Sequence, residues 1–223
     1  MKPLFRIKIC GITNPADARD AVELGADAVG LNFYNRSLRC VPPDAAAAIC
    51  QQLPEGVCKI GVFVNHSAAD IVETANRYGL DAVQLHGDER PEIMADLRGT
   101  HVIRAIRLGQ EATLESVLDE MNRWSGAGVA IFILDAEVGN QTYGGSGQTI
   151  DWNLAQSVCR VSPGPVILAG GLTPTNIAAA IRTVQPSGVD VASGVETFPG
   201  KKSAELLGDF VRQAKAALNL PTT

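Results

Sequence analysis

Short apolar runs alternate along the chain with longer stretches in which apolar residues recur every three or four positions. Uninterrupted apolar runs of this length are typical of strands in a parallel sheet that is buried on both faces, and the longer pattern is typical of amphipathic helices. The alternation therefore predicts repeated strand–helix units. Strands are expected at 5–10, 57–64, 102–106, 129–135 and 166–169, and helices at 16–24, 68–78, 112–124 and 175–183.

Three segments of similar sequence supply the remaining strands and the length of one unit. They span 25–31, 79–85 and 188–194, and each begins with a glycine where a helix C-cap is expected. The spacing between the second and third segments is close to twice that between the first two, so both fit a unit of about 27 residues, enough for a strand, a helix and two loops. A chain of 223 residues then holds roughly eight units.

Eight parallel units of this kind close into a barrel, so we predict an α/β fold, a single (β/α)8 TIM barrel over residues 1–223. Its active site is expected at the C-terminal face of the strands. An open doubly wound sheet is the alternative. Its usual fingerprint, G-x-G-x-x-G after the first strand, is replaced here by C-G-I-T-N-P at 10–15.

Charge and composition narrow the class of partner. The formal net charge of −5 gives no general basic field for a nucleic acid or an anionic membrane, and no apolar run approaches the ~20 residues that cross a bilayer. The five cysteines show no C-x-x-C spacing, which argues against a disulfide framework and a zinc site. We expect a cytoplasmic protein, either a monomer or a homodimer.

Two residues that end apolar runs are candidates for proton transfer. Cys10 closes the first run, and Lys8 lies on the same face of that strand, where an ammonium would favour the thiolate. Asp135 closes the run at 129–135, and burial at a strand end favours the protonated carboxyl, which suits a general acid. The simpler interpretations are a packed cysteine and a capping aspartate.

The ends of the seventh and eighth strands are candidates for binding a phosphate. TIM barrels commonly hold phosphate there, and Gly170 and Gly171 expose backbone amides while Ser193 and Gly194 add a hydroxyl and further amides. The same glycines would also suit tight turns alone.

Three further features remain open at this point. Arg39 could bind a carboxylate with two parallel hydrogen bonds or be a solvated surface charge. His86 could be catalytic or tied to backbone groups. The glycine-rich segment 142–149 suits a flap over the mouth of the barrel.

A set of motifs resembles one known family. They are K-I-C-G-I-T at 8–13, G-A-D-A-V-G at 25–30, G-V-F-V-N at 61–65, V-Q-L-H-G at 83–87, G-G-S-G at 144–147, G-V-E at 194–196 and P-G-K-K at 199–202. In this order they resemble phosphoribosylanthranilate isomerase of tryptophan biosynthesis.

The resemblance implies an Amadori rearrangement of N-(5'-phosphoribosyl)anthranilate to 1-(o-carboxyphenylamino)-1-deoxyribulose 5-phosphate, with no metal or cofactor. It implies that Cys10 is the general base and Asp135 the general acid. Arg39 would hold the anthranilate carboxylate, and the phosphate site would comprise the four residues at the seventh and eighth strand ends.

Two alternatives stay open. One is a related phosphosugar isomerase of histidine synthesis. An aspartate at the end of the first strand would favour it, but Cys10 stands there instead. The other is a barrel without activity that binds a phosphorylated ligand or a partner enzyme.

Overall fold

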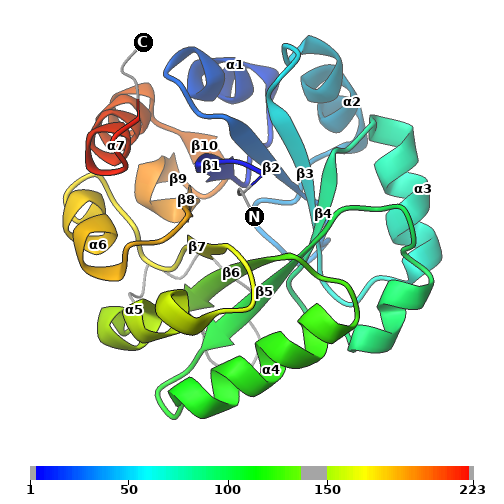
Figure 1. Ribbon diagram of the computed structural model, residues 1–223. Helices are drawn as coiled ribbons and strands as arrows, with labels where there is room; N and C mark the ends of the chain where they lie inside the picture. Colours follow the sequence, from blue (N-terminus) through cyan, green and yellow to red (C-terminus); the bar gives the residue numbers. More distant parts are fainter. Residues whose placement is uncertain (1–3, 137–149, 221–223) are drawn as a thin grey trace.

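Eight parallel strands close into a barrel in the computed structural model, which describes residues 4–136 and 150–220 (Figure 1). Each strand pairs with its neighbour in sequence, and β8 returns to pair with β1 through Ile7 and Val189. The predicted TIM barrel is therefore confirmed. The strands are β1 (Ile7–Cys10), β2 (Ala28–Asn32), β3 (Cys58–Phe63), β4 (Ala82–Leu85), β5 (Val102–Leu108), β6 (Ile131–Ala136), β7 (Val166–Leu168) and β8 (Gly188–Val191).

An outer ring of helices covers the barrel (Figure 1). The connection between β4 and β5 departs from the predicted unit, because it carries only a short 3-10 helix, η1 (Pro91–Ala95). The α-helices among the described residues are α1 (Pro15–Glu23), α2 (Pro43–Gln52), α3 (Ala68–Tyr78), α4 (Leu114–Gly126), α5 (Trp152–Val161), α6 (Ile177–Val184) and α7 (Ala204–Ala217).

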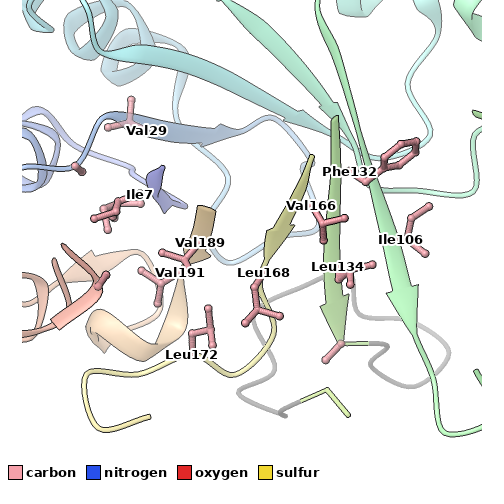
Figure 2. Close-up of a cluster of buried hydrophobic side chains, with 14 of the residues drawn as sticks. Ile7, Val29, Ile106, Phe132, Leu134, Val166, Leu168, Leu172, Val189 and Val191 are labelled. Carbon is pink, nitrogen blue, oxygen red and sulfur yellow. The ribbon is translucent and has the colours of Figure 1, made fainter. Parts of the chain in front are cut away.

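Alternating side chains on each strand separate two apolar clusters. Outward-facing residues form one cluster with buried residues of the helices, and Figure 2 draws Ile7, Leu134 and Val189 among its members. Inward-facing residues such as Ile133 and Ile167 fill the lower part of the barrel. On β1, β4 and β8 the inward positions become polar, so polar groups collect inside the barrel.

The repeated glycines have different roles. Gly79 caps α3 with a left-handed backbone, φ 58°, as predicted. The same prediction is wrong for Gly188, because α6 ends earlier and Gln185 takes the left-handed cap, φ 54°. Gly188 instead begins β8, where a Cβ atom would lie 2.8 Å from the carbonyl oxygen of Arg6. Its lack of a side chain serves strand packing.

A small two-stranded sheet follows the barrel. The turn after β8 is a short 3-10 helix, η2 (Ser193–Val195), and leads into β9 (Glu196–Phe198), which pairs antiparallel with β10 (Lys201–Lys202). None of the described helices is long and apolar enough to span a membrane. The predicted flap at 142–149 lies outside the described residues.

Candidate active site

A cleft that is partly open to solvent lies at the carboxyl ends of the strands. Its wall combines the ends of β1, β4, β6 and β8 with the turns after β2 and β7. The lining residues include Cys10, Gly11, Arg39, Gln84, His86, Asp135, Gly170, Gly171, Asp190 and Ser193.

Cys10 is the last residue of β1 and faces this cleft. Burial raises the pKa of its thiol above the ordinary value, whereas the charges of Lys8 and Lys202 lower it. The predicted influence of Lys8 therefore has the expected sign, but burial outweighs it. The thiol of the free protein is held mainly in its protonated form.

Lys8 also makes polar contacts with residues other than Cys10. Its side chain is fully buried, and its Nζ lies 2.8 Å from Asp190 Oδ2 and 2.9 Å from Gln84 Oε1. Burial lowers the pKa of Lys8, but the charges of Asp190 and Cys10 outweigh burial and raise it. The ammonium is thus retained inside the barrel, directly below the cleft.

Asp135 lies near the end of β6 and is also buried. Its Oδ1 accepts a hydrogen bond from the N–H of Ala136 at 2.8 Å. Its Oδ2 lies 3.2 Å from Nε2 of His86, although the approach lacks the alignment of a hydrogen bond. On its other side, the His86 ring contacts Nε2 of Gln84 at 3.0 Å through Nδ1.

Arg39 is held at the mouth by an ion pair. Its Nη2 lies 2.6 Å from Glu196 Oε2, and its Nε donates to the same carboxylate. Burial would raise the pKa of Glu196, but hydrogen bonds from Arg39 and the charge of Lys202 hold it below its ordinary range. A Cβ atom on Gly11 would lie 2.7 Å from Cδ of Arg39, so the glycine leaves room for the arginine stem.

The turns after β7 and β8 contain the four predicted phosphate-binding residues. Gly170 and Gly171 adopt left-handed backbones, with φ 81° and 64°, and line the cleft with Ser193. Gly194 lies beside the cleft, where a Cβ atom would come within 1.8 Å of the carbonyl oxygen of Leu172. Two adjacent turns are thereby packed closely together.

Sequence reasoning missed several polar residues of this region. Gln84 and Asp190 line the cleft, and Lys202 donates from Nζ to the carbonyl oxygens of Cys10 and Ala192 and to Glu196. For Gln84 and Asp190 a signal existed, since each polar residue interrupts an apolar run at an inward position. For Lys202 no such signal existed, because it does not interrupt an apolar run.

The described residues contain no group of three or more histidine, cysteine, aspartate or glutamate side chains placed to hold a metal ion. The absence of a metal or cofactor stays a prediction.

An eight-stranded parallel barrel that gathers titratable groups in one cleft at its strand ends places this chain in the class of TIM-barrel enzymes. Comparison with known proteins resolves the class further. A family model described as N-(5'-phosphoribosyl)anthranilate (PRA) isomerase matches residues 7–213. The chain belongs to this family, and the expected resemblance is confirmed.

Individual relatives agree with this assignment. The chain is 46% identical to N-(5'-phosphoribosyl)anthranilate isomerase of Pelobacter propionicus, covering 95% of this chain and 96% of the relative. It is also 46% identical to the Geobacter metallireducens protein of that name, covering 96% and 100%. The crystal structure of the Thermotoga maritima isomerase has a TM-score of 0.84 and 40% identity, covering 95% of this chain and 99% of that one.

A second similar solved structure is of a protein with a bound ligand. It is a phosphoribosyl anthranilate isomerase in complex with reduced 1-(o-carboxyphenylamino)-1-deoxyribulose 5-phosphate, with a TM-score of 0.81 and 38% identity, covering 95% of this chain and 99% of that one. The present chain is accordingly an isomerase of tryptophan biosynthesis.

Proposed function

We propose that Cys10 and Asp135 carry the proton transfers by which this isomerase converts N-(5'-phosphoribosyl)anthranilate into 1-(o-carboxyphenylamino)-1-deoxyribulose 5-phosphate. The observation that carries the proposal is that a thiol from β1 and a carboxyl from β6 line the same cleft, with glycine turns beside them. A phosphorylated sugar held at those turns would lie between an acid and a base.

Asp135 acts first in this scheme. Its carboxyl proton passes to the furanose ring oxygen, the bond from C1' to that oxygen breaks, and the anthranilate nitrogen supplies the electron pair that forms a Schiff base. The cationic nitrogen withdraws electrons from C2' and makes its proton acidic. Asp135 is left as a carboxylate beside His86.

Cys10 acts second. Its thiolate removes the proton from C2', and the electron pair of that bond neutralises the iminium nitrogen to give an enolamine, which tautomerises to the ketone product. Lys8 and Lys202 favour the thiolate against the effect of burial. Positive charge on the bound intermediate would favour it further.

The two ends of the substrate require separate binding groups. Arg39 would bind the anthranilate carboxylate, and its ion pair with Glu196 holds the guanidinium in one orientation at the cleft. Gly170, Gly171, Ser193 and Gly194 would bind the phosphate through backbone amides and one hydroxyl. No step needs a metal or cofactor, so we propose none.

The setting proposed for this enzyme is the cytoplasm, as a monomer or homodimer whose partner is the small phosphoribosyl substrate. We propose no nucleic-acid or membrane partner, because a net charge of −5 gives no basic field that would attract a nucleic acid or an anionic membrane. One similar solved structure is described as monomers generated from the dimeric isomerase of Thermotoga maritima, so the dimer is a property of that protein.

Turnover of substrate generated in place, followed by loss of its anthranilate fluorescence, tests the roles. We expect Cys10→Ala and Asp135→Asn each to lower kcat by about 10²–10⁴-fold, the usual contribution of one positioned proton-transfer group. Circular dichroism and thermal unfolding check that both variants fold. Full activity in either folded variant would refute the role of that residue, and a parent protein that binds product without turnover would indicate a binding barrel.

A further inference from the structure

Three polar side chains connect β1 to Asp135 through the interior of the barrel. Lys8 Nζ donates to Gln84 Oε1 at 2.9 Å, Gln84 Nε2 contacts His86 Nδ1 at 3.0 Å, and His86 Nε2 lies 3.2 Å from Asp135 Oδ2. Lys8 and Gln84 are almost completely buried, and His86 and Asp135 nearly so. We call Lys8, Gln84 and His86 the hydrogen-bond chain.

The chemistry of Lys8 fixes the direction of every bond in this chain. An ammonium has only donors, so the atom of Gln84 that faces it must be the carbonyl oxygen. The amide NH₂ of Gln84 then faces His86, and it too can only donate. His86 Nδ1 must therefore accept, which leaves the proton of the neutral imidazole on Nε2.

The other side of the ring faces Asp135. His86 Nε2 is buried and has no aligned hydrogen-bond partner among the described residues. Oδ1 of Asp135 already accepts from the N–H of Ala136, so Oδ2 is the oxygen turned toward the histidine. A buried N–H without a partner is costly, and a carboxylate at this distance would satisfy it after a small rotation.

We propose that the hydrogen-bond chain fixes His86 as the Nε2-protonated tautomer, and that this N–H orients Asp135 and stabilises the carboxylate left when Asp135 has given up its proton. The inference rests on the proposed role of Asp135 as the acid. Because the interaction strengthens as negative charge develops, it lowers the barrier more than it tightens binding. His86 is in this sense a positioning residue that acts through Asp135.

Two substitutions of His86 separate this role from simple packing. His86→Leu removes the donor, and we expect kcat to fall about a hundredfold with KM largely unchanged, the loss typical of one donor to a developing anion. His86→Gln places an amide N–H near the position of Nε2, so it should retain more activity than His86→Leu. His101→Leu, at an exposed position, is the control and should keep parental kcat.

The outcomes decide the proposal. An unchanged kcat in folded His86→Leu, or equal losses in the two His86 variants, would overturn it. A rise in KM at constant kcat would also contradict it, because that result indicates substrate binding. Parental kcat in folded Cys10→Ala and Asp135→Asn would instead refute the proposed function. The failure of this inference and the failure of the proposed function are therefore distinguishable.

The tautomer can be measured without turnover. Nitrogen NMR of histidine-labelled protein separates the protonated ring nitrogen from the unprotonated one, and we expect His86 to carry its proton on Nε2. Gln84→Glu replaces the donor with an acceptor, so the proton should move to Nδ1 while the signals of His66 and His101 stay unchanged. Protonated Nδ1 in the parent protein, or no change in Gln84→Glu, would overturn the assignment.

Discussion

Gly30 makes room for two residues of the site. It lies on β2 beside Cys10 in the sheet, and a Cβ atom there would come within 2.7 Å of Cys10 Sγ and 3.0 Å of Lys8 Cε. The side chains of Cys10 and Lys8 therefore occupy space that a side chain at position 30 would fill. The position of the proposed base depends on a neighbouring strand as well as on its own.

We expect Gly30→Ala to lower kcat/KM by more than tenfold, because the added methyl group displaces the thiol, and to cost about 1–3 kcal/mol of stability from overpacking. Steady-state kinetics and urea unfolding measure the two effects. Gly126→Ala is the matched control, since nothing lies within 4 Å of a Cβ atom there. Parental kinetics in Gly30→Ala would mean that the thiol is not fixed by this contact.

The raised pKa of Cys10 predicts where its thiol ionises. Burial favours the protonated thiol and outweighs the charges of Lys8 and Lys202, which favour the thiolate. Below the thiol pKa, the thiolate fraction rises about tenfold per pH unit.

We therefore expect Cys10 to ionise at a higher pH than the ordinary thiol value of 9.0. Thiol absorbance across the neutral and alkaline range, taken by difference from Cys10→Ala, measures this ionisation. A Cys10 thiol that ionises at or below pH 9.0 would contradict the effect of burial.

At the scale of elements, the two glycine turns form one unit. The turn after β7 supplies the carbonyl of Leu172, and the turn after β8 places Gly194 directly against it. A side chain at position 194 would therefore clash with backbone atoms of the turn after β7.

Gly194→Ala should separate the two turns and raise KM by at least tenfold while kcat falls less, because phosphate contacts bind the substrate throughout the reaction. Kinetics and calorimetric binding of the reduced product analogue measure the effect. Gly208→Ala on α7 serves as control, since a Cβ atom there meets only Leu24 at an ordinary 3.5 Å. An unchanged affinity would place the phosphate elsewhere.

At the scale of the whole molecule, Glu196 joins distant parts of the chain. It binds Arg39 from the turn after β2 and Lys202 from β10, and its side chain is 3% exposed. Lys202 in turn donates to the carbonyl oxygen of Cys10 at the end of β1. The first and last quarters of the chain are thus linked by charge at the mouth of the barrel.

The pH dependence of stability follows from the lowered pKa of Glu196. The folded pKa lies below the ordinary value of 4.5, so the stabilisation is complete above 4.5 and is lost as the pH falls through the folded pKa. We expect Glu196→Gln to be less stable than the parent protein at neutral pH, and the difference in unfolding free energy to shrink in acid. Urea unfolding at several pH values measures this, and a constant difference would contradict it.

Much of the barrel could be predicted from the sequence because each strand carries its own local signal. Runs such as 129–135 are apolar on both faces, and the repeated glycines mark where helices end. The misplaced cap at Gly188 arose because the third repeat is shifted relative to the helix before it. That residues 1–223 form one domain stays a prediction.

The candidate site was predictable only where a residue has a recognisable local position. Cys10 and Asp135 end apolar runs, so the fold alone directs attention to them. The bond from Lys8 to Gln84 joins residues 76 positions apart, and its existence depends on strand register across the barrel interior. No periodicity along the chain contains that information.

The pairing of Lys8 with Asp190 also constrains how the protein is made. The two residues are 182 positions apart, so during synthesis the ribosome releases Lys8 long before its carboxylate partner exists. A nascent chain that lacks β8 has no carboxylate from Asp190 to offset the cost of burying this ammonium. The ion pair inside the barrel can therefore form only after β8 has been synthesised and has paired with β1.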